Sequence, residues 1–390
     1  MTPVDLLLVV ALVAALVAGL GRGLLATVGG LAGLVAGGLA AFWVVPVVND
    51  ALPTSQWRAP ATLAIAVMLP LLGASAGAGV GHGLRRQVDR TPLRPLERLL
   101  GGVANLLVAA VAISFVGTAV KATGAPGLAQ AVSSSVVLRT IDDLTPTPVS
   151  RTLAQMRSAV LDDGLPRLDG LLGPRVAPAA PDVDLADPAL EASARSVARI
   201  WGTAYACGTS STGSGFVVAP DRVVTNAHVV AGVERPLVEL PGRAAREGRV
   251  VYFDPVADLA VVAVDALDAD PLPVAPTLAA GDTAAVQGYP YGGPFISTGA
   301  QVLDVGTVRV PESGGIGGGD REVYSLAAEV HPGNSGGPVL TTDGEVVGVI
   351  FGRADSEEDL AYAVTTAELL PVVAQATELD TAVEPGRCAA

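Results

Sequence analysis

The chain has 390 residues, half of them hydrophobic but only 4% aromatic, and a formal net charge of −14. A soluble enzyme rarely combines so much apolar sequence with so few aromatic rings, so part of the chain is expected to lie in lipid. Residues 1–122 hold eight basic and four acidic side chains, and the remainder holds sixteen and thirty-four. Because phosphate contacts need clustered Lys and Arg, the acidic remainder argues against a nucleic-acid partner.

Long apolar segments recur in the N-terminal third, at about 4–20, 24–48, 61–83 and 99–120. Each approaches the ~20 apolar residues that cross the hydrocarbon core of a bilayer. A cleaved signal peptide has one short apolar stretch, so the repetition argues against that interpretation. The glycine-rich run 29–38 suits close helix packing in lipid. We therefore predict a four-helix transmembrane domain over residues 1–122, in preference to the buried helical core of a soluble protein.

Positive charge in the connections predicts the orientation of these spans. The connection between the third and fourth spans carries Arg85, Arg86, Arg90, Arg94 and Arg98. This loop is expected on the cytoplasmic side, so the chain leaves the fourth span outside the cytoplasm. The protein is then a multi-pass plasma-membrane protein. Because the spans hold almost no ionisable groups, an anchor or scaffold is favoured over a proton-coupled transporter.

The first 160 residues resemble the colicin V production family. The resemblance rests on the opening PVDLLLVVALVAALVAGLGRG and on the glycine-rich second span that follows it. A linker is predicted over 123–194, with short helices at 126–142 and 148–162. Its stretch 163–190 is rich in proline, which favours extended, semi-rigid chain. We expect this stretch to hold the following domain away from the bilayer.

From residue 195 to the end at 390, short apolar runs alternate with Gly, Pro and Asp. Many short strands separated by turn residues predict an all-β barrel or sandwich domain. Three segments in it carry chemistry: TNAHVV contains His228, DLAVV begins at Asp258, and GNSGGP contains Ser335. Each one alone is more often structural, as a loop, a turn or a core histidine. Their combination in this order predicts a serine endopeptidase.

The chemistry of peptide hydrolysis explains these residue types. A serine hydroxyl needs a histidine as general base, and a carboxylate fixes the tautomer of that histidine. We predict the catalytic triad His228, Asp258 and Ser335. The glycines around Ser335 predict a tight turn, Gly333–Asn334–Ser335, that forms the oxyanion hole with the N–H groups of Gly333 and Ser335 as donors. No cofactor and no metal are expected.

Two assignments in this set have alternatives. Asp254 and Asp265 lie near Asp258, which is favoured because it directly precedes the apolar strand LAVV. His331 lies four residues before Ser335. Its place in the approach to the nucleophile predicts a role in the substrate groove or at the solvent surface rather than as the base.

The three segments resemble the trypsin-like serine proteases of the chymotrypsin fold, most closely the high-temperature-requirement group. The resemblance implies two six-stranded β-barrels with the triad in the cleft between them, the first barrel supplying the histidine and the aspartate. It also implies a substrate pocket near Glu329, Val330 and Phe351. Asn334 replaces the aspartate that forms an activating ion pair in the digestive enzymes, so activation by N-terminal cleavage is not expected.

The combined layout resembles the acid-resistance periplasmic serine proteases of mycobacteria and their actinobacterial relatives. That resemblance implies cleavage of cell-envelope proteins under acid or oxidative stress. The expected partners are protein or peptide substrates in the envelope and the lipid bilayer. Two alternatives stay open: a catalytically weak stress sensor that uses the protease fold for binding, and a membrane secretion factor.

Cys207 and Cys388 are the two cysteines of the sequence. Both lie in the part that we place outside the cytoplasm, where disulfides persist. We therefore predict a disulfide between them that holds the C-terminal tail against the start of the protease domain. The alternative is a pair of independent thiols.

Overall fold

A computed structural model describes residues 2–51, 58–122, 131–132, 134–158, 166, 168, 171–172, 177–204, 209–312, 316–354, 357 and 359–386. The chain divides into two units, Met1–Phe115 and Val116–Ala390. Each unit is described by itself.

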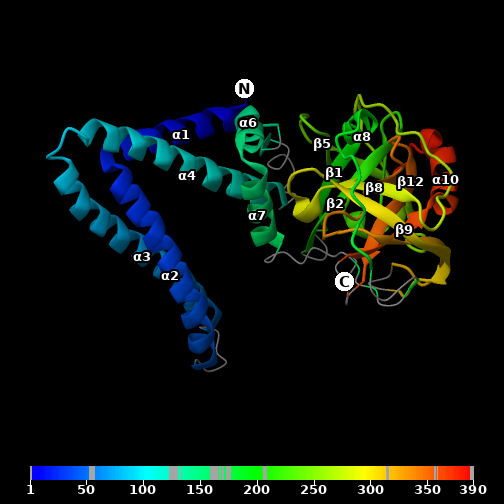
Figure 1. The fold of residues 1–390 in the computed structure, drawn as a ribbon, viewed down its shortest axis with the longest axis horizontal. Helices are drawn as coiled ribbons and strands as arrows, with labels where there is room; N and C mark the ends of the chain where they lie inside the picture. The colour runs from blue at the N-terminus through cyan, green and yellow to red at the C-terminus, as the bar shows by residue number, and fades with distance from the viewer. Residues whose placement is uncertain are drawn as a thin grey trace. The chain divides into compact units, whose positions relative to one another are not determined.

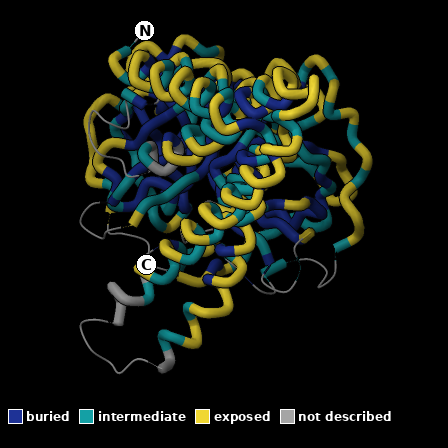
Figure 2. The backbone as a smooth tube through the Cα atoms, turned by 90° about the vertical axis from the view of Figure 1, so that its left-hand side faces the viewer, coloured by how far each residue is buried: buried dark blue, intermediate teal, exposed yellow. Residues whose placement is uncertain are grey.

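Four helices begin in the first unit, and each contains a segment long and apolar enough to cross a membrane: α1 (Pro3–Arg22), α2 (Leu24–Ala51), α3 (Arg58–Val88) and α4 (Arg94–Ala122). Large apolar side chains such as Leu6, Phe42 and Trp43 are exposed along them. Figure 2 shows these helices mostly in the exposed and intermediate colours. An apolar outer surface suits lipid, and the predicted four-helix N-terminal domain is confirmed.

Glycines bring α2 and α3 into backbone contact. A Cβ atom added to Gly33 would lie 2.0 Å from the carbonyl oxygen of Gly73, and one added to Gly77 would lie 2.0 Å from that of Gly29. Gly81 likewise meets the backbone of Leu25. The two helices therefore pack antiparallel through small residues, as the glycine-rich run predicted.

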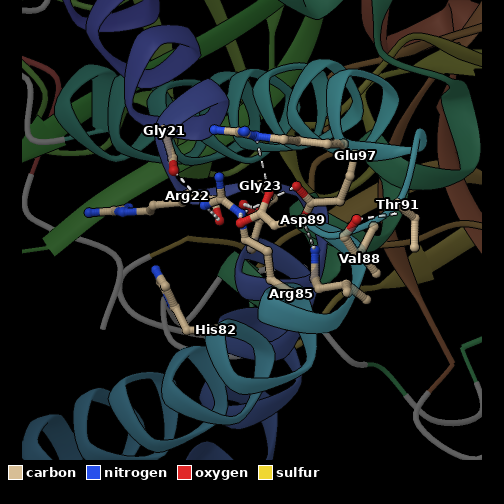
Figure 3. A network of polar contacts seen from close by, with 12 residues as sticks. Gly21, Arg22, Gly23, His82, Arg85, Val88, Asp89, Thr91 and Glu97 are labelled. Atoms are coloured by element: carbon tan, nitrogen blue, oxygen red, sulfur yellow. Dashed lines mark hydrogen bonds and ion pairs between the residues drawn. The ribbon is translucent and has the colours of Figure 1, made fainter.

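An ionic network closes the turn between α1 and α2 (Figure 3). The Arg85 guanidinium donates to the backbone carbonyls of Gly21 and Arg22. Its Nε atom lies 3.5 Å from a carboxylate oxygen of Glu97. The other oxygen of Glu97 accepts from the Leu25 N–H at 3.2 Å. One arginine from α3 and one glutamate from α4 thus hold the α1–α2 turn, with the carboxylate at the N-terminus of α2, where a negative charge is stabilised.

The predicted linker contains α6 (Val136–Leu144), α7 (Thr147–Ser158) and α8 (Pro188–Ala194). Its described proline-rich part does not run free of the protease domain. Leu168 belongs to the large apolar cluster of that domain, and Leu171, Leu172 and Val183 pack against it. Part of the linker is therefore a layer on the protease surface rather than a spacer alone.

Seven antiparallel strands form the first sheet of the protease domain (Figure 1), in the order β5-β4-β1-β2-β3-β7-β6. They are β1 (Val197–Ala204), β2 (Thr209–Ala219), β3 (Arg222–Thr225), β4 (Leu237–Glu239), β5 (Arg246–Glu247), β6 (Arg249–Asp254) and β7 (Leu259–Ala263). Strands β5 and β6 stand first and last in this order, yet only Gly248 separates them in the sequence. They are therefore the two halves of one bent strand. The sheet therefore curls into an open barrel of six strand positions.

The second sheet is a closed six-stranded barrel in the order β10-β13-β12-β11-β8-β9. Its strands are β8 (Thr283–Gly288), β9 (Ile296–Arg309), β10 (Asp320–Ala327), β11 (Pro338–Leu340), β12 (Val346–Arg353) and β13 (Leu360–Thr365). The 3₁₀ turn η1 (Pro290–Gly292) follows β8, and α10 (Thr366–Gln375) follows β13. The predicted chymotrypsin-like architecture is confirmed.

Separate apolar clusters fill the two sheets, and a larger one joins them. The joining cluster contains Val197 and Phe216 from the first sheet and Phe351 and Tyr362 from the second, all fully buried. Burial of such side chains contributes roughly 1.5–3 kcal/mol each. This shared core fixes the two sheets against each other, so loops from both meet at one place.

Candidate active site

His228 lies on a one-turn helix, α9 (Ala227–Val230), that directly follows β3. Its helical neighbours Ala227, Val229 and Val230 are buried in the first sheet. The next strand over is β7, and Thr225 of β3 pairs with Ala260 of β7. This register brings the end of β3 beside the residue that precedes β7.

That residue is Asp258, which is buried and adopts a left-handed backbone conformation with φ +55°. Aspartate tolerates this region better than most residues. Its carboxylate accepts from the His228 N–H at 3.0 Å and lies 2.9 Å from the ring nitrogen Nδ1. The Asn226 side-chain amide donates to the Asp258 carbonyl at 2.8 Å. A carboxylate beside Nδ1 favours the tautomer protonated there, which leaves Nε2 as the acceptor.

The two alternative aspartates are engaged elsewhere. The Asp254 carboxylate caps its own turn by accepting from the N–H groups of Val256 and Ala257. Asp265 is exposed and pairs with Arg249 at 3.1 Å. The structure therefore brings Asp258, and neither neighbour, against His228.

The turn that carries Ser335 uses most of its amides internally. The Asn334 N–H donates to the His331 carbonyl at 3.0 Å, and the Gly337 N–H donates to the Asn334 carbonyl at 2.8 Å. The Gly336 N–H donates to Ile350 of β12 at 2.8 Å. In the described part of the chain, the N–H groups of Gly333 and Ser335 have no acceptor.

The backbone fixes the direction of these two N–H groups. Each one shares a peptide plane with the carbonyl of the preceding residue. The Pro332 carbonyl accepts from the Tyr291 N–H, and the Asn334 carbonyl accepts from the Gly337 N–H. Because a trans peptide is planar, a fixed carbonyl fixes the N–H on the opposite side. Gly333 has φ +94°, and a Cβ there would lie 2.4 Å from the Tyr289 carbonyl oxygen. Unused N–H donors beside a serine are the kind of group that can bind a developing oxyanion. Of the predicted turn, Asn334 contributes position rather than a donor.

The sequence analysis missed Ser214 on β2. Its N–H donates to the Ser335 carbonyl at 2.7 Å, and its hydroxyl donates to the Gly333 carbonyl at 2.7 Å. The same hydroxyl accepts from the Tyr289 N–H at 2.9 Å, and the Thr225 hydroxyl donates to the Ser214 carbonyl. Ser214 thus connects the first sheet to the turn of the second sheet that carries Ser335.

Ser335 Oγ and His228 Nε2 are both buried and have no hydrogen-bond partner among the described residues. No hydrogen bond joins them in this structure. Bonds between nucleophile and base are often long in unliganded sites and shorten when substrate binds. The rest of the described site therefore leaves the hydrogen-bonding capacity of both atoms unused.

A buried cation lies behind the aspartate. Arg321 of β10 donates to the Ala257 carbonyl at 2.8 Å, and its guanidinium lies 4.8 Å from the centre of the Phe351 ring. Burial lowers the pKa of Arg321, and the nearby Asp258 carboxylate opposes that shift. No motif of the sequence pointed to this residue.

The predicted pocket residues separate in the structure. Val330 and Phe351 are fully buried in core clusters. The Glu329 side chain is 62% exposed and lies 3.0 Å from His331 Nε2, and the His331 ring stacks on Tyr291. Only Glu329 of the three therefore presents its side chain at the surface.

Among the described residues, no group of His, Cys, Asp and Glu is arranged to hold a metal ion. The predicted disulfide partners Cys207 and Cys388 lie outside the described residues.

Two family models match the chain: "Trypsin-like peptidase domain" over residues 213–349 and "Colicin V production protein" over residues 4–146. "Serine protease Rv3671c" of Mycobacterium tuberculosis strain H37Rv is 35% identical over 296 residues, which is 74% of each protein. The chain belongs to this family of trypsin-like serine proteases with an N-terminal colicin V production domain. The match confirms both predicted resemblances and the predicted serine endopeptidase activity.

A solved structure agrees with this assignment. The crystal structure of the Rv3671c protease in its active form matches with a TM-score of 0.52 and 34% identity, covering 58% of this chain and all of that chain. A second relative, named "Probable periplasmic serine endoprotease DegP-like" in Hahella chejuensis, is 33% identical over 174 residues. That match covers 42% of this chain and 35% of the relative.

Proposed function

We propose that this serine protease is anchored in the membrane by its four N-terminal helices and hydrolyses envelope proteins through the triad His228, Asp258 and Ser335. The observation that carries the proposal is the hydrogen bonding of the turn around Ser335, residues 333–337, which we call the nucleophile turn. Its amides are bonded except those of Gly333 and Ser335, and it lies in the same domain as a histidine held by a buried carboxylate. A donor pair of this kind stabilises a tetrahedral oxyanion.

The reaction follows from these positions. The Ser335 hydroxyl attacks the scissile carbonyl carbon while His228 Nε2 takes its proton, and the charge that develops on oxygen is bound by the two free amides. Asp258 stabilises the imidazolium that forms. The imidazolium then gives its proton to the leaving amine, and the C–N bond breaks. Water hydrolyses the resulting acyl-enzyme by the same steps, with His228 again as base.

The envelope location is supported by charge and by similarity. Five arginines in the α3–α4 connection and at the helix ends beside it favour the cytoplasmic side for that loop, and the chain then leaves α4 outside. The DegP-like relative is named as periplasmic. A role in acid or oxidative stress rests on the resemblance to the mycobacterial acid-resistance proteases, and the proposed substrates are proteins of the cell envelope.

The test is hydrolysis of a denatured protein substrate by the full-length protein in detergent, compared with Ser335→Ala. The variant is expected to lose about 10⁴-fold or more of the rate. Its thermal unfolding midpoint should stay near that of the wild type, because one hydroxyl is removed without a lost hydrogen bond. Equal rates in the two proteins would refute the proposed nucleophile. Substrate binding without hydrolysis in the wild type would favour the stress-sensor alternative.

A further inference from the structure

Two short helices, α6 and α7, follow the last membrane helix, and α6 packs against the end of that helix. The segment of α4 that is long and apolar enough to cross a membrane ends at Gly117. Gly117 and Leu138 of α6 both belong to the second unit. A Cβ atom added to Gly117 would lie 3.0 Å from the Leu138 side chain, which is buried. Helix α6 therefore lies beside the point where α4 leaves the hydrocarbon core.

The face of α6 that points away from Leu138 is apolar and open to the surroundings. Val136, Thr140 and Leu144 are exposed, and Leu144 is 78% exposed. Residues four apart share one face of a helix, and Leu138, two positions from Val136, lies on the opposite one. The Thr140 hydroxyl donates to the Val136 carbonyl at 2.9 Å, so it needs no partner outside the helix.

Helix α7 repeats this arrangement. Val149, Thr152 and Met156 are exposed and lie on one face at spacings of three and four. The Thr152 hydroxyl donates to a carbonyl of its own helix at 2.9 Å. The opposite face is covered, because Ala154 is buried and a Cβ atom added to Gly293 would lie 2.7 Å from the Ala154 Cβ. Helix α7 is thus fixed to the protease domain on one side and apolar on the other.

Continuity with α4 indicates what covers these outer faces. Exposed apolar patches mark sites for a protein partner or a membrane. A protein interface carries about one hydrogen bond per 100–200 Å², whereas the threonine hydroxyls of these faces already bond within their helices. Because α6 touches the end of the span, lipid is the neighbour that the fold places there. We call the four exposed apolar side chains the lipid face: Val136, Leu144, Val149 and Met156.

We propose that α6 and α7 lie in the bilayer interface on the side where α4 ends, with the lipid face against the lipids, and that they hold the protease domain at the membrane surface. Amphipathic helices bind this region through the apolar area that they bury. The two helices hold three arginines and two aspartates, so the binding rests on apolar burial rather than on anionic headgroups. The inference rests on the proposed function, because it takes the four N-terminal helices as the membrane anchor.

The contact between α7 and the protease domain lies close to the nucleophile turn. Gly293 directly follows η1, and the Tyr291 N–H of η1 donates to the Pro332 carbonyl at 2.5 Å. Helices held in the interface therefore keep the proposed active site near the bilayer surface. The favoured substrates are then peptide segments within reach of that surface.

The first experiment measures the depth of single fluorophores on the full-length protein in phosphatidylcholine nanodiscs. The fluorophore is attached to a genetically encoded azide at Leu144 or Met156 in the lipid face, with controls at Leu107 in the α4 span and Leu370 on α10, all exposed residues. Lipids with a nitroxide near the headgroup should quench the fluorescence at 144 and 156. Iodide in the water should quench the fluorescence at 370 and leave that at 144 and 156 largely unquenched.

The control positions separate the two ways of failing. Iodide quenching at 144 and 156 as strong as at 370, with the fluorophore at 107 quenched by lipid, would overturn the interfacial helices and leave the membrane anchor standing. A fluorophore at 107 that is quenched by iodide and not by lipid would reject the anchor, and the inference with it.

The consequence for substrates is tested with polar side chains in the lipid face. Leu144→Gln combined with Met156→Gln should lower the hydrolysis of a peptide tethered to lipid headgroups, relative to a soluble peptide, about fivefold. The reason is a lower effective concentration of the tethered peptide at the active site. Leu370→Gln is the matched control and should leave the ratio of the two rates unchanged. An unchanged ratio in the double variant would overturn the proposed hold on the protease domain.

The last measurement uses the unmodified protein, so no substitution can disturb its fold. A phosphatidylcholine that carries a diazirine near its headgroup is activated in the nanodiscs, and its adducts are located by mass spectrometry. Adducts are expected within 136–156 as well as within the α4 span, 94–117. Adducts in the span and none within 136–156 would overturn the inference.

Discussion

Ser214 joins the first sheet to the nucleophile turn through both its N–H and its hydroxyl. The hydroxyl donates to the Gly333 carbonyl. The peptide plane of that carbonyl lies between the two planes whose N–H groups are the proposed oxyanion donors. Ser214 touches no substrate atom in this scheme and is therefore a positioning residue. Its effect should appear in the transition state rather than in substrate binding.

Ser214→Ala is predicted to lower kcat about 10- to 100-fold with little change in KM. This decrease in kcat is smaller than the decrease expected when an oxyanion donor itself is removed. Affinity for a peptidyl boronate, which places an oxygen in the oxyanion hole, should fall in parallel, and Ser214→Thr should restore much of both. The control is Ser325→Ala, because the buried Ser325 hydroxyl has no hydrogen-bond partner among the described residues. A Ser214→Ala variant that loses stability but keeps boronate affinity would contradict the positioning role.

Asp258→Asn should lower kcat about 10⁴-fold, because the amide no longer selects the His228 tautomer that leaves Nε2 as base. Asp254→Asn should stay near the wild type, since its side-chain carbonyl still accepts from the N–H groups of Val256 and Ala257. Steady-state peptide hydrolysis measures both. An inactive Asp254→Asn beside a normal Asp258→Asn would show that the acid is misassigned.

The proposed triad could be drawn from the sequence because each member lies in a short local pattern: the histidine in TNAHVV, the aspartate before LAVV and the serine in GNSGGP. Ser214 and Arg321 were not predictable in this way. Ser214 reads as one more loop serine in GSG, and its partner Gly333 is 119 positions away. Arg321 becomes notable only when β10 places it beside Ala257. Side-chain bonds between distant segments leave no periodic signal in one sequence.

At the scale of helices and strands, the glycine contact between α2 and α3 is the sharpest feature of the membrane unit. Gly33→Ala would place a methyl group 2.0 Å from the Gly73 carbonyl oxygen, so the helices must separate. We expect it to lower the free energy of unfolding by ~1–3 kcal/mol. Thermal unfolding of the full-length protein in detergent measures this change.

Gly38→Ala is the matched control, because a Cβ there meets nothing within 4 Å and alanine favours the helix by up to ~1 kcal/mol. An equal loss of stability in both variants would show that the α2–α3 contact is not the cause.

The strand pattern predicted the protease fold, but two features of how the elements are arranged could not be predicted from it. The bend at Gly248 that joins β5 to β6 depends on pairing with β4 on one side and β7 on the other. The proline-rich linker was expected to act as a spacer, yet Leu168 packs into the core. Composition describes how stiff a linker is, and it does not say which surface the linker contacts.

The Cys207–Cys388 disulfide stays a prediction. A bond that closes the loop between positions 207 and 388 adds roughly 4–5 kcal/mol to the free energy of unfolding in the chain-entropy model. Peptide mapping of non-reduced protein taken from the envelope should find the two cysteines in one linked pair. Two free thiols would refute the bond.

For the whole molecule, the predicted topology decides which substrates the protease meets. Five arginines lie in the α3–α4 connection or at the helix ends beside it. The orientation rule counts Lys and Arg even where, as at Arg85 and Arg94, acidic side chains pair with them. Reporter fusions and accessibility labelling should place residue 90 in the cytoplasm and residue 200 outside it. Residue 200 in the cytoplasm would invert the topology and remove envelope proteins as substrates.

The most direct test of the central claim is to locate the reactive serine in the intact protein. Full-length protein is treated with a fluorophosphonate, digested and examined by mass spectrometry. The account predicts one adduct, on Ser335, which is absent in Ser335→Ala and strongly reduced in His228→Ala because the base is missing. An adduct on another serine, or continued peptide hydrolysis in Ser335→Ala, would contradict it.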